Sequence, residues 1–264
     1  MSSMLSTPPL CWTHLAAFAS GGSLFAAVFY RSGRLFSLLS PGYRSLGTIK
    51  QAQLRYHAAV GLNGAVLSTL GCYACFFGHL SLEMISKDIP VVRHASAFNL
   101  GFLLADVLIS VCVPVTGPGT ALSFGTALHH FLTGTSELMS LVHAVVPYVV
   151  AFHHRMDLTA TPTRLMIILK TLGVSRDAPG YMPFWVGSLI LNLCVRVLVL
   201  PFYWYDFASS IGPQIDDIKR RDYRVWILMV VGQPCFHLLM VKWWLTAFLS
   251  LKRYLMNSKT IKVN

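Results

Sequence analysis

Long apolar runs separated by short polar connections dominate the sequence. Three runs contain no Asp, Glu, Lys or Arg: residues 1–30, 56–82 and 107–136. About 20 apolar residues in a helix cross the ~30 Å core of a bilayer, and lipid requires backbone hydrogen bonds to close within each helix. The pattern therefore predicts an all-α, multi-pass transmembrane helical bundle of about seven helices. We place the spans at residues 10–30, 56–79, 95–115, 121–137, 141–165, 184–205 and 225–250.

Composition agrees with this prediction. The chain has 264 residues, of which 55% are hydrophobic and 12% charged, whereas soluble domains carry about 25% charged residues. The first apolar run lacks a basic leader and is longer than a signal peptide's apolar core, so we expect a retained helix. The six cysteines lie in apolar surroundings, and we expect inert buried thiols even for the C-x-x-C pair, Cys72 and Cys75.

The formal net charge of +11 has two interpretations, a nucleic-acid partner or membrane topology. The distribution favours topology and excludes nucleic acid. Seven spans would put more than half of the basic residues on one side, namely Arg31, Arg34, Arg44, Lys50, Arg55, Arg164, Lys170, Arg176, Lys252, Arg253, Lys259 and Lys262. The opposite side would hold Lys87, Arg93, Lys219, Arg220, Arg221 and Arg224, offset by Asp206, Asp216, Asp217 and Asp222. Because cytosolic loops are enriched in Lys and Arg, the N-terminus is predicted to be luminal or exterior and the C-terminus cytosolic.

Ionisable residues inside spans are costly and are candidates for function. Asp106 must face the bundle interior, either to fix packing or to act in a site. The neighbouring His129 and His130 can line one cavity and relay protons, act as base or nucleophile, or bind metal. We expect no metal, because helical ligands usually stand three or four residues apart. Arg196 should pair inward with Asp106 or Asp157.

The remaining polar residues receive plainer interpretations. We expect Asn192 to lie one turn from Arg196 on the same face. Glu137 is predicted to be a solvated acid at the outer end of a span. His153 and His154 are expected to pair locally with Arg155 and Asp157. The isolated histidines should be satisfied polar or interfacial residues: His57, His79, His94, His143 and His237.

The order of these features resembles the TLC-domain family of multi-pass membrane proteins, which includes the ceramide synthases. An Asp in FLLAD precedes a His-His doublet in LHHFLTG, then an acid and a Thr/Pro cluster in DLTATP, and finally VKWWLTAFLSLKR before a basic tail. The resemblance covers about residues 50–255. It implies a six-helix core around an acyl-accommodating cavity, preceded by one N-terminal helix. The domains would be 1–49 (helix and basic loop), 50–255 (TLC-like) and 256–264 (basic tail).

In ceramide synthases the His-His doublet belongs to the acyl-transfer centre, so the resemblance implies His129 and His130 as the centre with Asp106 and Asp157 in support. The second acid of the ceramide-synthase signature is absent, because Ala160 stands in its place and Met156 replaces a preceding His. DLTATP is closer to the acid-x-Ser-Thr-Pro pattern of the branch without ceramide-synthase activity, where the acid is typically Glu.

Three functions follow as hypotheses. The first is a lipid-homeostasis protein that binds membrane lipids or acyl chains and needs no cofactor. The second is an acyltransferase making ceramide, with acyl-CoA as co-substrate. The third is a transporter. The Pro/Gly interruption at 114–119 favours it, but the sequence shows no internal repeat, which many transporters have. The resemblance also implies the endoplasmic reticulum, and a homodimer is a candidate assembly.

Overall fold

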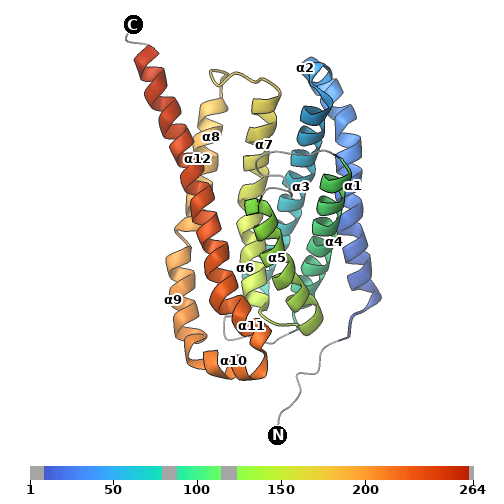
Figure 1. Cartoon of the computed structure of the whole chain (residues 1–264), viewed down its shortest axis with the longest axis vertical. Coiled ribbons are helices and arrows are strands. Elements are labelled where there is room, and N and C mark those ends of the chain that lie inside the picture. Colours follow the sequence, from blue (N-terminus) through green and yellow to red (C-terminus); the bar gives the residue numbers. More distant parts are fainter. Residues whose placement is uncertain (1–8, 79–87, 114–123, 262–264) are drawn as a thin grey trace.

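The computed structural model describes residues 9–78, 88–113 and 124–261, and these residues form helices and no strand (Figure 1). The all-α prediction is therefore confirmed. The helices are α1 (Trp12–Leu39), α2 (Pro41–Ser45), α3 (Thr48–Phe77), α4 (Pro90–Cys112), α5 (Phe124–His143), α6 (Pro147–Met156), α7 (Ala160–Thr171), α8 (Tyr181–Asn192), α9 (Leu200–Ser210), α10 (Ile215–Arg221), α11 (Tyr223–Ile227) and α12 (Gln233–Ile261).

Several of these helices continue into one another through short turns of different pitch. A 3₁₀ turn, Asp157–Thr159, joins α6 to α7, and π-helical turns join α8 to α9 (Leu193–Val197) and α11 to α12 (Leu228–Gly232). Pro201 and Pro234 follow the two π turns closely. Because proline has no N–H and clashes with the carbonyl four residues earlier, a widened turn before it keeps the helix continuous.

Five helices are long and apolar enough to cross a membrane: Trp12–Leu39, Thr48–Phe77, Pro90–Cys112, Tyr181–Ser210 and Tyr223–Met256. The predicted spans at 121–137 and 141–165 correspond to α5 and to the continuous α6–α7 helix, which are not among the five. That these two also cross the membrane stays a prediction. The predicted span ends at 79, 114–115 and 121–123 lie outside the described residues, as does the interruption at 114–119.

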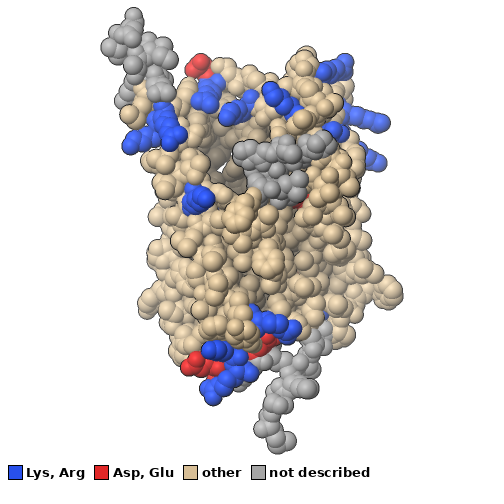
Figure 2. Space-filling model, in the orientation of Figure 1, with Lys and Arg blue, Asp and Glu red and all other residues tan. Residues whose placement is uncertain are grey.

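The charged residues gather at the two ends of the bundle (Figure 2). One end, formed by α2, the α7–α8 connection and the last part of α12, carries Lys and Arg with few acids; the other, at α10, carries both signs (Figures 1 and 2). The described chain starts near the mixed end and finishes near the basic end. Two basic residues that were predicted to lie in connections between spans lie inside the bundle. Arg164 belongs to α7 and lines a cavity, and Arg93 is buried in α4 beside Asp88. Lys87 and Lys262 lie outside the described residues.

Helix α1 is an integral part of the bundle, because it packs along α4 and also contacts α3. Phe25 and Phe29 of α1 are buried against Tyr56 of α3 and Phe102 of α4. The Phe25 ring meets the Phe102 ring edge-on, with 4.9 Å between centroids. This aromatic cluster fixes α3 and α4, and thereby positions Tyr56 and Asp106, which line the functional site described below.

A tight turn joins α5 to α6. Ala144 and Val146 both have φ of 50°, and Pro147 begins α6. A β-branched residue rarely adopts a positive φ, and here Val146 is buried in the main apolar core. The turn reverses the chain within three residues, so Glu137, six residues before the end of α5, comes level with His154, seven residues after the start of α6.

The cysteine prediction is partly wrong. All six thiols are free, as expected, but they are not buried: Cys72 and Cys75 are half-buried, whereas Cys11, Cys112, Cys194 and Cys235 are exposed on the surface of the bundle. The apolar neighbours that suggested burial lie on the outside of the bundle as well, for example Phe76 beside Cys75 and Val111 beside Cys112.

Candidate functional site

A cavity of about 630 Å³ lies inside the bundle, bounded by α3, α4, α5, α6, α7, α8 and α12. This volume falls in the range of ligand pockets. Its polar lining comprises Tyr56, Asn63, Asn99, Asp106, Thr126, His129, His130, Thr133, Glu137, His153, His154, Asp157, Thr159, Thr163, Arg164, Ser188, Asn192, Arg196 and Lys242. Its aromatic lining comprises Phe102, Trp185, Phe236, Trp243 and Trp244. All six residues that the sequence singled out for the site therefore line one cavity: Asp106, His129, His130, Asp157, Asn192 and Arg196.

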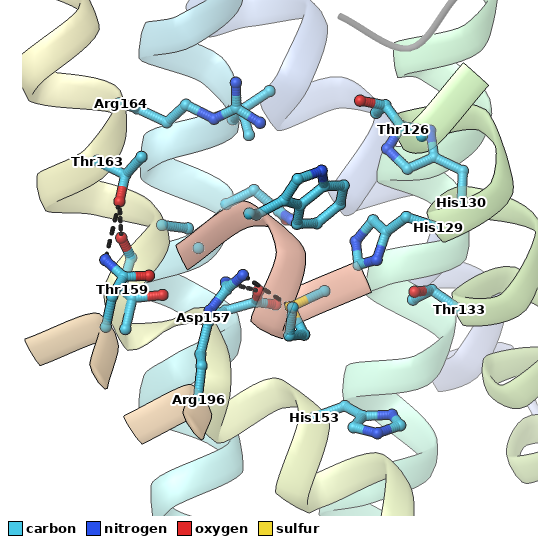
Figure 3. A pocket seen from close by; sticks show the side chains of 18 of the residues that line it. Thr126, His129, His130, Thr133, His153, Asp157, Thr159, Thr163, Arg164 and Arg196 are labelled. Atoms are coloured by element: carbon cyan, nitrogen blue, oxygen red, sulfur yellow. Dashed lines mark hydrogen bonds and ion pairs between the residues drawn. The ribbon is translucent and has the colours of Figure 1, made fainter. Parts of the chain in front are cut away.

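The histidine doublet occupies the α5 wall of the cavity (Figure 3). His130 Nε2 lies 3.5 Å from Asp106 Oδ2 on α4. The same oxygen accepts from the Tyr56 hydroxyl at 3.3 Å, and Ser110 donates to the other oxygen at 3.3 Å. His129 packs between rings, 5.1 Å from Phe236 and 5.5 Å from Trp243. The predicted inward orientation of Asp106 and of both histidines is thus confirmed, and Asp106 lies beside His130.

An ion pair lies on the wall opposite the doublet (Figure 3). Arg196 Nη2 stands 3.6 Å from Asp157 Oδ1, which confirms the predicted inward pairing and selects Asp157 over Asp106. Arg196 Nε also donates to the Met156 carbonyl at 3.3 Å. The π-helical turn that contains Arg196 aims it at Asp157 in the 3₁₀ turn. Both special turns therefore serve the site.

Asn192 sits one turn before Arg196 and also lines the cavity, as the sequence predicted. Its amide donates to the Thr163 hydroxyl at 3.2 Å and to the Ser188 carbonyl at 2.9 Å. Asn192 thus joins α8 to α7. We interpret it as a residue that holds the wall of the cavity.

The cavity extends toward the basic end of the bundle. Trp185, Ile167 and Ala247 continue its lining in that direction, and the space-filling view shows a hollow in the surface there (Figure 2). Arg164, which points into the space (Figure 3), lies between this end and the ion pair, and its Nη1 stands 3.1 Å from His57 Nδ1. A cationic side chain, Arg164, therefore lines the cavity between its basic end and the ion pair.

The structure overturns the prediction for Glu137. It is not a solvated acid but is 2% exposed within α5. Its Oε1 lies 2.6 Å from His154 Nε2 and accepts from Asn99 Nδ2 at 2.8 Å. The expected local pairing of the second doublet is wrong for the same reason, since His154 turns to Glu137 and Asp157 to Arg196. The sequence signal that could have placed Glu137 in the site is its spacing. One face of the helix carries Thr126, His129, His130, Thr133 and Glu137.

Two other histidines were also misread. His237 is 3% exposed, and neither ring nitrogen has a hydrogen-bond partner among the described residues. Its ring packs against Tyr203 at 5.0 Å and against His153 at 5.6 Å. His153 in turn stacks on Phe236 at 4.2 Å. These rings belong to an aromatic core next to the cavity and not to an interface.

In the described part of the chain, no group of three or more His, Cys, Asp or Glu residues could hold a metal ion. Several buried polar atoms nevertheless lack partners there, including Nδ1 of His129 and of His130. Buried polar groups normally make hydrogen bonds. The His129 and His130 side chains therefore carry buried nitrogens whose hydrogen bonds are not made by any described residue.

Comparisons of the chain with protein-family models, curated proteins and solved structures give no match. The fold and the site define its class: an all-helical protein with five helices able to cross a membrane and a polar cavity enclosed among its helices. The chemistry of the cavity therefore has to carry any functional conclusion.

Proposed function

We propose that the protein is a seven-span membrane protein of TLC-domain type that binds a lipid acyl chain in its cavity and thereby influences membrane lipid composition. The observation that carries the proposal is the cavity itself. Its lining combines long aromatic and aliphatic side chains with a charged section around His129, His130, Asp157 and Arg196. An amphipathic ligand has the same two parts, an apolar chain and a polar group.

The arrangement of the chain supports this assignment. With α5 and the α6–α7 helix as spans, seven crossings connect a luminal N-terminus to a cytosolic C-terminus, and the basic end faces the cytosol. The cavity extends to that end, so a lipid with an anionic group would enter from the cytosolic leaflet. We place the protein in the endoplasmic reticulum by the TLC resemblance, with a homodimer as the assembly to test.

Replacing Gly125 by leucine tests the proposal by filling the cavity. Gly125 lines the cavity, and a Cβ added there meets only the Trp243 side chain, at 3.7 Å. The added side chain would project into the space, and loss of a helical glycine favours the helix. We expect purified wild-type protein to retain lipid identified by mass spectrometry, and the Gly125→Leu variant to lose at least three quarters of it, roughly the loss that 1 kcal/mol produces.

The matched control is Gly187→Leu, because Gly187 is exposed on α8 and nothing lies within 4 Å of its added Cβ. This variant should retain lipid like the wild type. In cells that lack the protein, the wild-type and Gly187→Leu forms should restore lipid composition and Gly125→Leu should not. Equal lipid retention by all three forms, or an unchanged lipid profile in cells without the protein, would count against the proposal.

A second candidate function is acyl transfer, favoured by the His130–Asp106 contact of 3.5 Å. A carboxylate beside an imidazole holds its orientation and favours its acting as a base. His129, adjacent on the same wall, would take a proton or an acyl group, and Arg164 and Lys242 would attract the phosphates of acyl-CoA.

The test is purified protein with labelled acyl-CoA and sphinganine. If the protein is an acyltransferase, labelled ceramide should form, and His129→Ala and His130→Ala should each lower its rate by at least 100-fold. The Asp106→Asn variant should retain more activity than either, because Asp106 acts through His130. No product from folded wild-type protein would reject this function and leave lipid binding standing.

A further inference from the structure

A second hollow lies at the basic end of the bundle, between α1, α2 and α3. It is an open groove of about 610 Å³, and it shares no lining residue with the cavity that contains the histidine doublet. Three arginines line it, one from each helix: Arg34 of α1, Arg44 of α2 and Arg55 of α3. Lys and Arg project from this corner of the molecule, where α2 lies (Figures 1 and 2).

The three arginines have no carboxylate partner among the described residues. Residues 1–82 contain no Asp or Glu, so none of the three helices that form the groove can supply one. The described ion pairs with an arginine all belong to later helices and involve Arg93, Arg196, Arg220 and Arg224. Guanidinium groups stay charged in proteins, and like charges that share a site repel one another. An anion bound in the groove would offset that repulsion.

Contacts among the three helices fix the walls of the groove. The Gln51 amide on α3 donates to the carbonyl of Tyr43 at 3.3 Å and to that of Leu46 at 2.9 Å, which ties α2 to α3. Gly33 of α1 allows a close approach on the other side. A Cβ at Gly33 would stand 3.1 Å from the Tyr43 hydroxyl and 3.2 Å from Arg55 Cδ. The groove is therefore a built feature of the fold and not only a surface between side chains.

Arg55 is held in place before any ligand binds. Its guanidinium carbon lies 5.0 Å from the centroid of the Phe29 ring, and its Nε donates to the Gln51 carbonyl at 3.4 Å. These contacts use the face of the guanidinium group and one of its five N–H donors. The donors on the two terminal nitrogens remain for a ligand, and the Tyr43 hydroxyl lines the same groove.

We infer that this groove binds a phosphomonoester group. The planar fork of a guanidinium group matches two oxygens of a phosphate. A phosphomonoester carries close to two negative charges at pH 7, so it offsets more of the positive charge of three arginines than a phosphodiester with a single charge does. The same group occurs on phosphatidic acid in a membrane and on small soluble esters, and the experiment below separates these two sources.

The experiment is native mass spectrometry of the purified full-length protein with equal amounts of dioctanoyl phosphatidic acid and dioctanoyl phosphatidylcholine, which have the same acyl chains. We expect phosphatidic acid to bind at least tenfold more tightly. Arg44→Gln and Arg55→Gln should each lower its affinity about tenfold, the effect of losing one hydrogen bond to a charged group. Arg31→Gln is the matched control, because Arg31 is exposed on α1 outside the groove. It removes the same charge and should change the affinity less than threefold.

Glycerol 3-phosphate, which has the same phosphate ester without acyl chains, identifies the source of the ligand. If it displaces phosphatidic acid at a similar concentration, the groove takes a soluble phosphate ester. If displacement needs a concentration more than 100-fold higher, the groove takes the headgroup of a membrane lipid. Either result supports a phosphomonoester site.

Three outcomes would overturn the inference. The first is equal binding of phosphatidic acid and phosphatidylcholine. The second is a preference for phosphatidic acid that survives both Arg44→Gln and Arg55→Gln, which would place this lipid elsewhere. The third is an equal loss in Arg31→Gln and Arg44→Gln, which would indicate diffuse surface charge. Arg44 is exposed on α2, so Arg44→Gln tests the groove even if the half-buried Arg55 is needed for folding.

Discussion

Replacing Gly101 by leucine is expected to lower the free energy of unfolding by about 3 kcal/mol, at the upper end of the usual cost of overpacking. A Cβ at Gly101 of α4 would overlap the carbonyl oxygen of Phe18 in α1, and a Cβ at Gly21 would overlap that of Phe98. Backbone cannot move aside as a flexible side chain can, so the two helices must separate. The measurement is unfolding by denaturing detergent in mixed micelles.

The control for this prediction is Gly134→Ala on α5. A Cβ there meets only Leu103 Cδ1, at an ordinary 3.8 Å. Removal of the glycine favours the helix, so this variant should be as stable as the wild type or more stable by up to about 1 kcal/mol. If Gly101→Leu were as stable as Gly134→Ala, the close approach of α1 to α4 would be wrong.

Breaking the Glu137–His154 pair is the second large effect that we expect. Replacing Glu137 by leucine leaves His154 and Asn99 buried without their acceptor. Removal of one partner of a buried pair costs roughly 3–5 kcal/mol. We expect Glu137→Leu to fall in that range and Glu137→Gln, which keeps an accepting oxygen, to lose less than half as much. The measurement is again the free energy of unfolding.

A double-mutant cycle distinguishes the pair from two separate packing effects. His154→Leu should also destabilise the protein, but Glu137→Leu combined with His154→Leu should cost less than the sum of the two single variants by about 2 kcal/mol. Apolar residues of similar volume can replace a buried pair at little cost. Strictly additive losses would show that the 2.6 Å contact contributes nothing of its own.

These two predictions concern different parts of one assembly. The α1–α4 contact places Tyr56 and Asp106 through the aromatic cluster of Phe25, Phe29 and Phe102. The Glu137–His154 pair ties α5 to α6 at the inner end of the cavity. A variant that separates α1 from α4 should therefore disturb the His130 side of the site, whereas loss of the pair should disturb the α5–α6 wall of the cavity.

Much of this protein is determined by local chemistry and could be predicted from the sequence. Runs without charge must form helices in lipid, which gave the all-α class. The cost of burying a lone charge made Asp106 and Arg196 turn inward, and both do so. The doublet His129–His130 and Asp157 stood out for the same reason, and the structure brings them to one cavity.

The tertiary structure alone decided which groups meet. The sequence left two partners open for Arg196, Asp106 and Asp157, and a π-helical turn 36 to 40 residues after Asp157 presents Arg196 to that residue. Glu137 was read as solvated because it stands near the end of an apolar run, and only the turn with Ala144 and Val146 shows that α6 covers it. The sequence determines which residues cannot face lipid, because the free-energy cost of exposing a charged side chain to lipid depends on that side chain itself. Which groups become partners depends on the rotation of each helix and on the turn at Ala144 and Val146 and the 3₁₀ and π-helical turns, and those follow from packing across the whole bundle.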